Sequence, residues 1–317
     1  MNTRFIRSIY NESFEKYKLE LKSYIPITNK SYKVISNNND KYLIKKTKDK
    51  ANSKYSFLKN EGVDNIVYPI VNNSDVYSSR INDNLYNEIY CVLPFVDDTY
   101  VFNETKAKGL IEELQYLHFK TSFYRKLSIG KSRKKMEEIL SYLDYKFNLI
   151  ESYVRTIEAQ PFDEFSIPIL KKYKYILESK KVMALYNKKV INAIKEEKSV
   201  MYCFLHNNPK IDHLIINSGK KYLISIDNGV IGIPSLDIAK FYIENCDINF
   251  DIKTHILDYF TKFNDDFYFD YFVFLVLFIY VKSLIIEKKD YVSTQNFVFV
   301  SDSLKMFLNL FDLATLD

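Results

Sequence analysis

The sequence predicts an α+β protein with two lobes, a β-rich lobe over residues 1–97 and a helical lobe over residues 98–317. Short runs of β-branched and aromatic residues, bounded by turn residues, fill much of the first third of the chain. Apolar residues at helical spacing fill most of the remainder, except that a pair of strands returns within residues 201–240. A chain of 317 residues, 47% of them hydrophobic, is long enough for roughly two domains.

Strands and turns dominate the first lobe. The strands are predicted over 31–35, 41–46, 66–71 and 87–92. The polar turn 37–40 joins the first two strands into a hairpin. Helical spacing predicts helices over 14–25 and 51–60, and Gly62 stops the second of them. The lobe ends near Asp97, where the chain passes into the helical lobe.

The second lobe is expected to be helical on both sides of the returning strands. Helices are predicted over 104–118, 134–159, 169–197, 251–263, 268–288 and 301–313, with another beginning at Leu236. A strand leads into the polar loop 206–212, and strands over 213–216 and 222–226 follow. Asp227 comes directly after the last strand, where catalytic and metal-binding acids commonly lie.

Composition and charge narrow the class of protein. The 45 basic and 40 acidic residues give a net charge of +5, too balanced to indicate a nucleic-acid partner. The most apolar run, 271–281, has about half of the roughly 20 residues that a membrane span needs, so a core helix is predicted there. The N-terminal stretch alternates charged and apolar residues, which is typical of an amphipathic helix and not of a secretory signal. Cys91, Cys203 and Cys246 lie far apart in apolar sequence, so reduced, buried thiols and a cytoplasmic setting are expected.

Three short segments carry a resemblance to a known family. They read HNNPKIDH at 206–213, IDNG at 226–229 and PSLDIA at 234–239. Their order and spacing resemble the active-site segment of the aminoglycoside phosphotransferase and choline kinase superfamily, with spore-coat kinase-like proteins as the closest group. The resemblance implies a bilobal protein kinase-like fold, ATP and magnesium as cofactors, and a small-molecule hydroxyl as acceptor.

The resemblance assigns roles to five polar residues. The family's loop is His-Gly-Asp-x-x-x-x-Asn, in which the Asp is the base and the Asn holds magnesium. His206 matches the first position, but Asn208 stands at the base position and His213 at the magnesium-binding position. Asp227 matches the second magnesium ligand, and Asp237 matches an acid that braces the loop from the next helix.

The nucleotide side of the resemblance rests on the first lobe. Lys45 matches the lysine that pairs with the phosphates, and Leu43, two residues earlier on the same strand face, would then point toward the adenine. Leu93 and Phe95 lie in the segment that resembles the hinge, whose backbone binds the adenine edge. The alternative reading of Lys45 and Lys46 is a pair of surface lysines on an edge strand.

Two departures from the family pattern weaken the expected nucleotide site. The turn 37–40 takes the position of the nucleotide-covering loop but has no glycine, so its backbone is poorly suited to cradle phosphate. The helix over 51–60 has no acidic residue to pair with the strand lysine. The acceptor is expected among the helices 134–197, where the sequence identifies no contact residue.

Two functions stay open. One is a pseudokinase, a catalytically impaired kinase-like protein that acts as a binding or structural module, for example in a spore coat. The other is an active ATP- and magnesium-dependent phosphotransferase in which Asp212 has been recruited beside the loop. Asn208 cannot act as a base, which favours the first function. His206, Asp212 and His213 can also form a polar network that only holds the loop, and this interpretation is compatible with a pseudokinase.

Overall fold

The computed structural model describes residues 9, 12–13, 15–48, 50–81 and 88–313. The chain forms two compact units, and each is made of two separate segments. The first unit comprises Met1–Ser122 and Cys203–Ile231, and the second comprises Phe123–Tyr202 and Gly232–Asp317. The first carries an antiparallel sheet and the second is mostly helical, which confirms the α+β class. The division into lobes at Asp97 stays a prediction.

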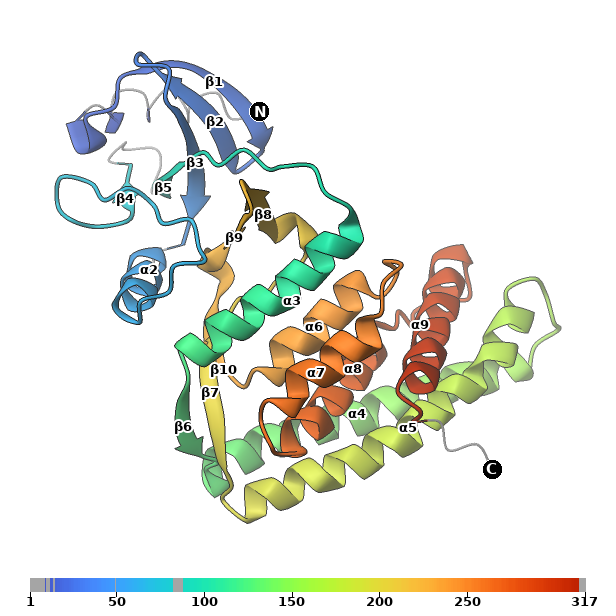
Figure 1. Ribbon diagram of the computed structural model, residues 1–317. Helices are drawn as coiled ribbons and strands as arrows, with labels where there is room; N and C mark the ends of the chain where they lie inside the picture. Colours follow the sequence, from blue (N-terminus) through green and yellow to red (C-terminus); the bar gives the residue numbers. More distant parts are fainter. Residues whose placement is uncertain (1–8, 10–11, 14, 49, 82–87, 314–317) are drawn as a thin grey trace. The chain divides into compact units, whose positions relative to one another are not determined.

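A five-stranded antiparallel sheet forms the framework of the first unit (Figure 1). In spatial order its strands are β1 (Leu21–Thr28), β2 (Ser31–Ser36), β3 (Lys41–Thr47), β5 (Ile89–Pro94) and β4 (Ser79–Arg80). The hairpin of β2 and β3 matches the sequence prediction, and β3 pairs along its length with β5. β3 is therefore a central strand and not the edge strand of the alternative reading.

The two faces of this sheet have different environments. One face packs into a buried cluster that includes Tyr17, Tyr32, Val34, Ile44, Tyr90 and Val92. Leu43 and Lys45 flank Ile44, so the alternation of side chains along a strand turns them to the other face. They pair there with Leu93 and Cys91 of β5. The candidate site is on this second face.

The predicted helix over 14–25 is wrong in its second half. Leu21–Thr28 is strand β1, which pairs antiparallel with β2. Pro26 lacks an N–H group and is tolerated in a sheet mainly on edge strands, and β1 is an edge strand. Ile25 and Ile27 flank this proline and favour a strand. Residues 15–17 are helical, so the start of the predicted helix is confirmed there, while Phe14 lies outside the described residues.

The strand predicted over 66–71 is also wrong. Only Ile66 makes a β-bridge, to Leu223, and Val67 donates a long hydrogen bond of 3.4 Å to the same residue. Ile70 donates instead to Val92, at 2.7 Å. Pro69, between them, has no N–H group with which to continue a ladder. This segment therefore contacts Leu223 at one end and strand β5 at the other as an extended loop.

Two helices, two short turns and a second hairpin also belong to the first unit. They are α2 (Ala51–Asn60), α3 (Asn103–Lys120), the 3-10 turns η1 (Ile211–His213) and η2 (Ile226–Asn228), and the hairpin of β8 (Leu214–Asn217) and β9 (Lys220–Leu223). α2 has the predicted bounds, and Gly62 follows it with φ +68°. β9 ends earlier than predicted, because Ser225 takes the left-handed conformation with φ 65° and starts η2.

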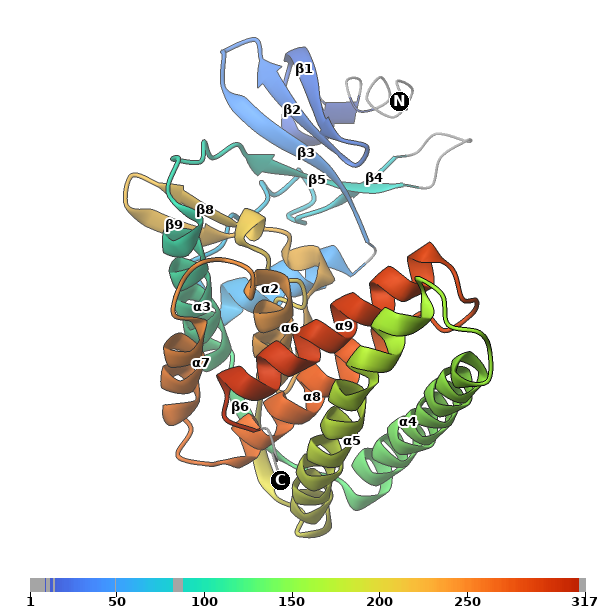
Figure 2. The ribbon, with the colours of Figure 1, turned by 90° about the vertical axis from the view of Figure 1, so that its right-hand side faces the viewer.

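Helices make up most of the second unit (Figure 2). They are α4 (Ile129–Glu158), α5 (Ser166–Lys195), α6 (Ser235–Asn245), α7 (Ile252–Thr261), α8 (Phe267–Ser283) and α9 (Tyr291–Leu310). Strands β6 (Phe123–Lys126), β7 (Ser199–Leu205) and β10 (Val230–Gly232) complete the described elements. α9 begins ten residues before the predicted start at 301, because Asp290 caps it by accepting a 2.9 Å hydrogen bond from the Ser293 N–H.

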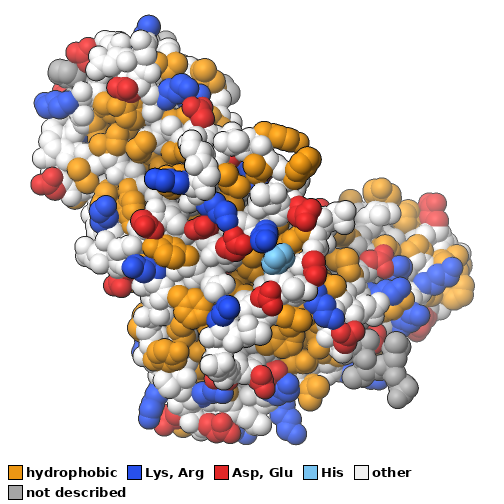
Figure 3. All heavy atoms as spheres, viewed as in Figure 1, with side chains coloured by type: hydrophobic (Ala, Val, Ile, Leu, Met, Phe, Trp, Pro, Cys, Tyr) orange, Lys and Arg blue, Asp and Glu red, His pale blue; other side chains and the backbone are white. Residues whose placement is uncertain are grey.

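The apolar run 271–281 lies in α8, which is packed by α5, α6 and α9 and is buried on nearly all sides. Contact with several helices explains why its apolar residues surround the helix instead of forming one stripe. No helix among the described residues has both the length and the apolar composition that crossing a membrane requires. The surface is charged with both signs, and Figure 3 shows basic and acidic side chains interspersed over the face drawn.

Gly229 provides a test of packing beside η2. A Cβ atom at this position would overlap the Phe204 ring and lie 2.8 Å from the Leu205 carbonyl oxygen. We expect Gly229→Ala to lower the free energy of unfolding by about 1–3 kcal/mol, because the core must shift to accept the methyl group. Chemical denaturation measures this change. Gly130→Ala is the matched control, since the nearest atom is 4.0 Å away and alanine favours the α4 helix. Equal stability of both variants would contradict this packing.

Candidate functional site

A cavity of about 540 Å³ lies within the first unit, between the second face of the sheet and the hairpin of β8 and β9. Its apolar lining includes Leu43, Val67, Leu93, Val96, Ile215 and Ile224. These side chains come from both layers, so a flat apolar group can be held between them. We call this cavity the sheet pocket.

Polar groups converge on the same cavity. Lys45, Ser225, Asp212 and His213 line the sheet pocket, and so does Phe95 at the exit of β5. The structure thus brings together all four residues predicted on the nucleotide side and two of those predicted around the loop. Their roles toward a ligand stay predictions. Asp98, Thr28 and Ser31 also line the pocket and were not predicted.

Lys45 and Asp227 form the central ion pair of the site. The Lys45 Nζ atom lies 2.6 Å from Asp227 Oδ1 and 3.3 Å from the Ser225 hydroxyl. The Lys45 side chain is 21% exposed and the Asp227 side chain 12%. Asp227 reaches this position from η2, after the left-handed turn at Ser225, and not from a strand end as predicted.

As predicted, helix α2 offers no acid to Lys45, and lysines on and before this helix contact η2 instead. Lys54 of α2 donates a 2.6 Å hydrogen bond to the backbone oxygen of Asp227, and Lys48 donates one of 3.1 Å to Asn228 Oδ1. Burial lowers the pKa of Lys54, and Asp227 partly opposes this shift. The carboxylate partner of Lys45 therefore comes from Asp227, at the far end of the β8–β9 hairpin.

His206 fixes the loop that follows β7. It is fully buried, and its Nε2 atom lies 2.7 Å from the carbonyl oxygen of Ile224. A carbonyl only accepts, so Nε2 carries the proton, and Nδ1 accepts a 3.3 Å hydrogen bond from the Asn208 N–H. With both ring nitrogens engaged, His206 ties the loop to the end of the β8–β9 hairpin. Asp237 is buried in the first turn of α6, in the second unit, and its bracing role stays a prediction.

His213 carries its ring proton on the other nitrogen. Its Nδ1 atom lies 2.7 Å from the carbonyl oxygen of Asn208, so Nδ1 carries the proton and Nε2 has a free lone pair. Burial lowers the pKa of His213, which keeps the ring neutral at pH 7. The His206 and His213 rings pack with their centroids 5.5 Å apart. A neutral imidazole thus lines the pocket at the position where the family pattern has an amide.

The side chains present do not fit a magnesium site. Magnesium prefers oxygen ligands, whereas the predicted pair consists of one carboxylate and one imidazole. Oδ1 of Asp227 already receives the Lys45 ammonium. Nowhere in the described ranges do three His, Cys, Asp or Glu side chains gather as a metal site.

The turn that borders the sheet pocket is not the predicted one. Thr28 and Ser31, at the turn between β1 and β2, line the pocket, whereas the turn 37–40 does not. Their hydroxyls hydrogen bond at 2.7 Å, and Thr28 also accepts the Lys30 N–H at 3.1 Å. This turn also lacks glycine and uses one of its amides internally, so its backbone is poorly suited to cradle phosphate. The error follows from the helix wrongly predicted over 21–25.

The segment after β5 is anchored to the β8–β9 hairpin. Asp98 accepts a 2.9 Å hydrogen bond from the Ile216 N–H, and Thr99 donates one of 2.7 Å to the Ile216 oxygen. Pro94 has no N–H group, and the Phe95 N–H donates to Lys41 at 3.1 Å. These two positions of the predicted hinge therefore have no N–H group left to bind the edge of a ring.

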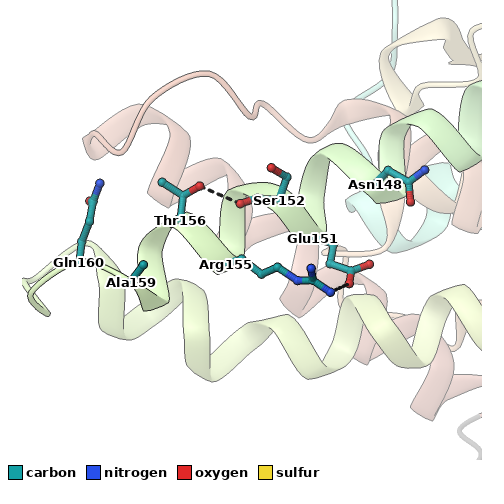
Figure 4. A pocket seen from close by; sticks show the side chains of 7 residues that line it. All are labelled: Asn148, Glu151, Ser152, Arg155, Thr156, Ala159 and Gln160. Atoms are coloured by element: carbon teal, nitrogen blue, oxygen red, sulfur yellow. Dashed lines mark hydrogen bonds and ion pairs between the residues drawn. The ribbon is translucent and has the colours of Figure 1, made fainter.

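A second hollow, of about 590 Å³, lies on α4 in the second unit (Figure 4). All of its lining residues belong to this helix or the turn after it. Its polar contacts are internal to the helix, such as the 2.6 Å ion pair of Arg155 and Glu151. A single helix and its turn supply this lining, whereas side chains from two layers line the sheet pocket, so the sheet pocket is the better candidate.

The sheet, the following helix, the loop after β7 and the β8–β9 hairpin together define a protein kinase-like fold. Among solved structures, an aminoglycoside phosphotransferase from Alicyclobacillus acidocaldarius subsp. acidocaldarius is similar, with a TM-score of 0.67 and 12% identity over 94% of this chain and 93% of that one. A microcompartment-associated aminopropanol kinase has a TM-score of 0.57 and 9% identity over 98% of this chain and 99% of that one. An amicoumacin kinase has a TM-score of 0.52 and 10% identity over 100% and 96%.

These similarities show that the chain has the fold of small-molecule kinases of the aminoglycoside phosphotransferase type. No protein-family model matches the sequence, and a search of curated proteins found no match. The fold is thus shared over nearly the whole chain, while the sequence has diverged far from these structures.

The His213 pKa predicts a pH dependence of stability. Because the folded-state pKa lies below the unfolded value of about 6.5, the unfolded chain binds a proton more readily as the pH falls through that value. Stability from the neutral ring is therefore present above about pH 6.5 and is lost below it. We expect wild type to lose more unfolding free energy than His213→Asn between about pH 7.5 and pH 5.5 in urea titrations. An equal loss in both proteins would refute the assignment.

The Lys45–Asp227 ion pair predicts a strong pairwise energy. We expect Lys45→Met and Asp227→Asn each to lower the free energy of unfolding by about 1–3 kcal/mol, because each leaves a mostly buried group without its partner. The double variant should lose less than the two single losses combined, as measured by urea denaturation. Lys41 and Asp97, an exposed pair 3.1 Å apart, are the matched control, with about 0.2–1 kcal/mol expected. Additive losses at Lys45 and Asp227 would show that the pair is not formed.

Proposed function

We propose that the protein is a kinase-fold binding module whose sheet pocket takes a nucleotide and whose capacity for phosphoryl transfer is impaired. The observation that supports this most directly is the state of the loop after β7. Asn208 stands where the family has its base, and its backbone oxygen holds His213 in place. An amide side chain cannot accept the proton of an attacking hydroxyl, so the usual proton transfer has no acceptor there.

The binding role rests on the composition of the sheet pocket. Apolar side chains from two layers enclose the cavity, and Lys45 brings a positive charge to its wall. A ligand with a flat apolar part and an anionic part matches both features. The amicoumacin kinase of similar fold was solved in complex with AMP-PNP, Ca2+ and Ami, which supports a nucleotide as the class of ligand. Phe95 and Leu43 would contact the ring and Lys45 the phosphates.

An active phosphotransferase is the second candidate, and one observation favours it. Asp212 lines the sheet pocket on η1, beside His213, and its side chain is exposed. A carboxylate in this place can accept a proton from a hydroxyl that enters the pocket. Small-molecule acceptors are the substrates named for similar structures, such as aminopropanol, and an acceptor of this kind is proposed for this candidate. Spore association remains an expectation from the sequence resemblance.

Binding can be measured by thermal unfolding with and without ADP. A ligand that binds only the folded state stabilises it by about 2.7 kcal/mol at a hundredfold excess over its Kd. We expect ADP to raise the melting temperature of wild type, and Leu43→Trp, which fills the apolar cavity, to abolish that rise. Absence of any shift in wild type would reject the binding module.

Turnover separates the two candidates. We expect wild type to hydrolyse ATP far more slowly than the rate of about 1 s⁻¹ or more typical of kinases, and Asn208→Asp with His213→Asn to raise the rate. Adding Asp227→Asn to that double variant should remove the gain, which is the control for a contaminating ATPase. Wild-type turnover at about 1 s⁻¹, reduced about a hundredfold by Asp212→Asn, would establish the active enzyme instead.

A further inference from the structure

Three lysines meet at the short segment that follows β9. Lys45 of β3 contacts the Asp227 carboxylate at 2.6 Å, and Lys54 of α2 contacts the Asp227 backbone oxygen at 2.6 Å. Lys48, between β3 and α2, lies 3.1 Å from Asn228 Oδ1. We call Lys45, Lys48 and Lys54 the lysine cluster.

The lysine cluster carries more positive charge than its surroundings neutralise. Among the residues that the structure describes, Asp227 is the one carboxylate that these ammonium groups contact, and their other partners, Ser225 and Asn228, are neutral. Besides burial, the positive charge of neighbouring lysines contributes to lowering the pKa of Lys54. Excess charge of one sign at a partly enclosed place attracts an ion of the other sign.

The ammonium groups also retain unused donors. Each has three N–H bonds. Lys45 uses two of them, on Asp227 and Ser225, while Lys48 and Lys54 use one each. Toward the described part of the chain, all three therefore keep at least one N–H group for a ligand. Charged N–H groups form strong hydrogen bonds to phosphate oxygens.

Lys45 belongs both to the lysine cluster and to the lining of the sheet pocket. Lys45 and Ser225 line that cavity, and the same Lys45 ammonium contacts Asp227. If a nucleotide places its ring in the pocket, its phosphates would lie beside Lys45 and extend toward Lys54 and Lys48. The anion needs no glycine-rich turn in this arrangement, because side-chain ammonium groups take the place of backbone amides.

We propose that the lysine cluster binds the phosphates of a nucleoside diphosphate or triphosphate directly, without a divalent cation. The proposal rests on the nucleotide pocket of the proposed function. It accounts for the poor fit of the site to magnesium, since the positive charge that a metal would supply is built into the chain. Magnesium bound to the phosphates should weaken binding, because it neutralises the anion and adds charge beside the lysines.

Calorimetric titration of the full chain with ADP tests this. We expect ADP to bind in EDTA at least as tightly as in excess magnesium. We expect Lys54→Gln, which removes a charge, to raise the Kd for ADP in EDTA about tenfold, the scale of one charged hydrogen bond. Lys220→Gln, at an exposed lysine beside the turn between β8 and β9, removes the same charge and should leave the Kd unchanged.

Adenosine, which has no phosphate, separates the lysine cluster from the pocket. We expect Lys54→Gln to bind adenosine as wild type does, which also shows that the variant is folded. ADP binding that requires magnesium, or an ADP affinity that Lys54→Gln leaves unchanged, would overturn the proposal and leave the nucleotide pocket standing. Failure of wild type to bind ADP or adenosine under any condition would overturn both.

Discussion

The ion pair between Lys45 and Asp227 joins the two layers that enclose the sheet pocket. Lys45 comes from the centre of the sheet, and Asp227 follows the β8–β9 hairpin. A mostly buried pair is stable only if further polar contacts offset the loss of hydration. The Ser225 hydroxyl and the Lys54 ammonium supply them. The left-handed turn at Ser225 is needed for the same reason, because it carries the carboxylate back toward the sheet.

The loop after β7 is held by a second polar network. His206 binds the Ile224 oxygen, Asn208 binds His206, and His213 binds Asn208. Every one of these contacts uses a backbone group, so the network fixes the path of the chain and leaves few side chains for chemistry. This is the arrangement expected of a satisfied network that holds a loop. The exposed carboxylate of Asp212, outside these contacts, is the exception that an enzyme would use.

The sequence allowed the fold class to be predicted, and the alternation along the strand 41–46 correctly placed Leu43 and Lys45 on one face of the sheet. Their roles toward a nucleotide stay predictions. The helix predicted over 14–25 is wrong at β1, because helical spacing was given more weight than Pro26, which favours an edge strand. Because β1 was not predicted, the turn between β1 and β2 at Thr28 and Ser31 was not predicted either. The contacts of Lys48 and Lys54 with η2 could not be predicted, since they join residues about 180 positions apart in the sequence. No local pattern encodes which carboxylate Lys45 meets.

The first unit is discontinuous in sequence, and this affects the order in which it can fold. Its sheet is complete once residue 122 has been synthesised, but the hairpin that closes the pocket belongs to residues 203–231. The apolar face carrying Leu43 and Leu93 is therefore uncovered while the intervening helices leave the ribosome. Uncovered apolar surface of this kind invites aggregation or capture by chaperones. The entropy cost of closing a long intervening segment grows only slowly with its length, so the helical insertion costs little stability. Its cost is kinetic, because the nascent chain can aggregate before the hairpin closes the pocket.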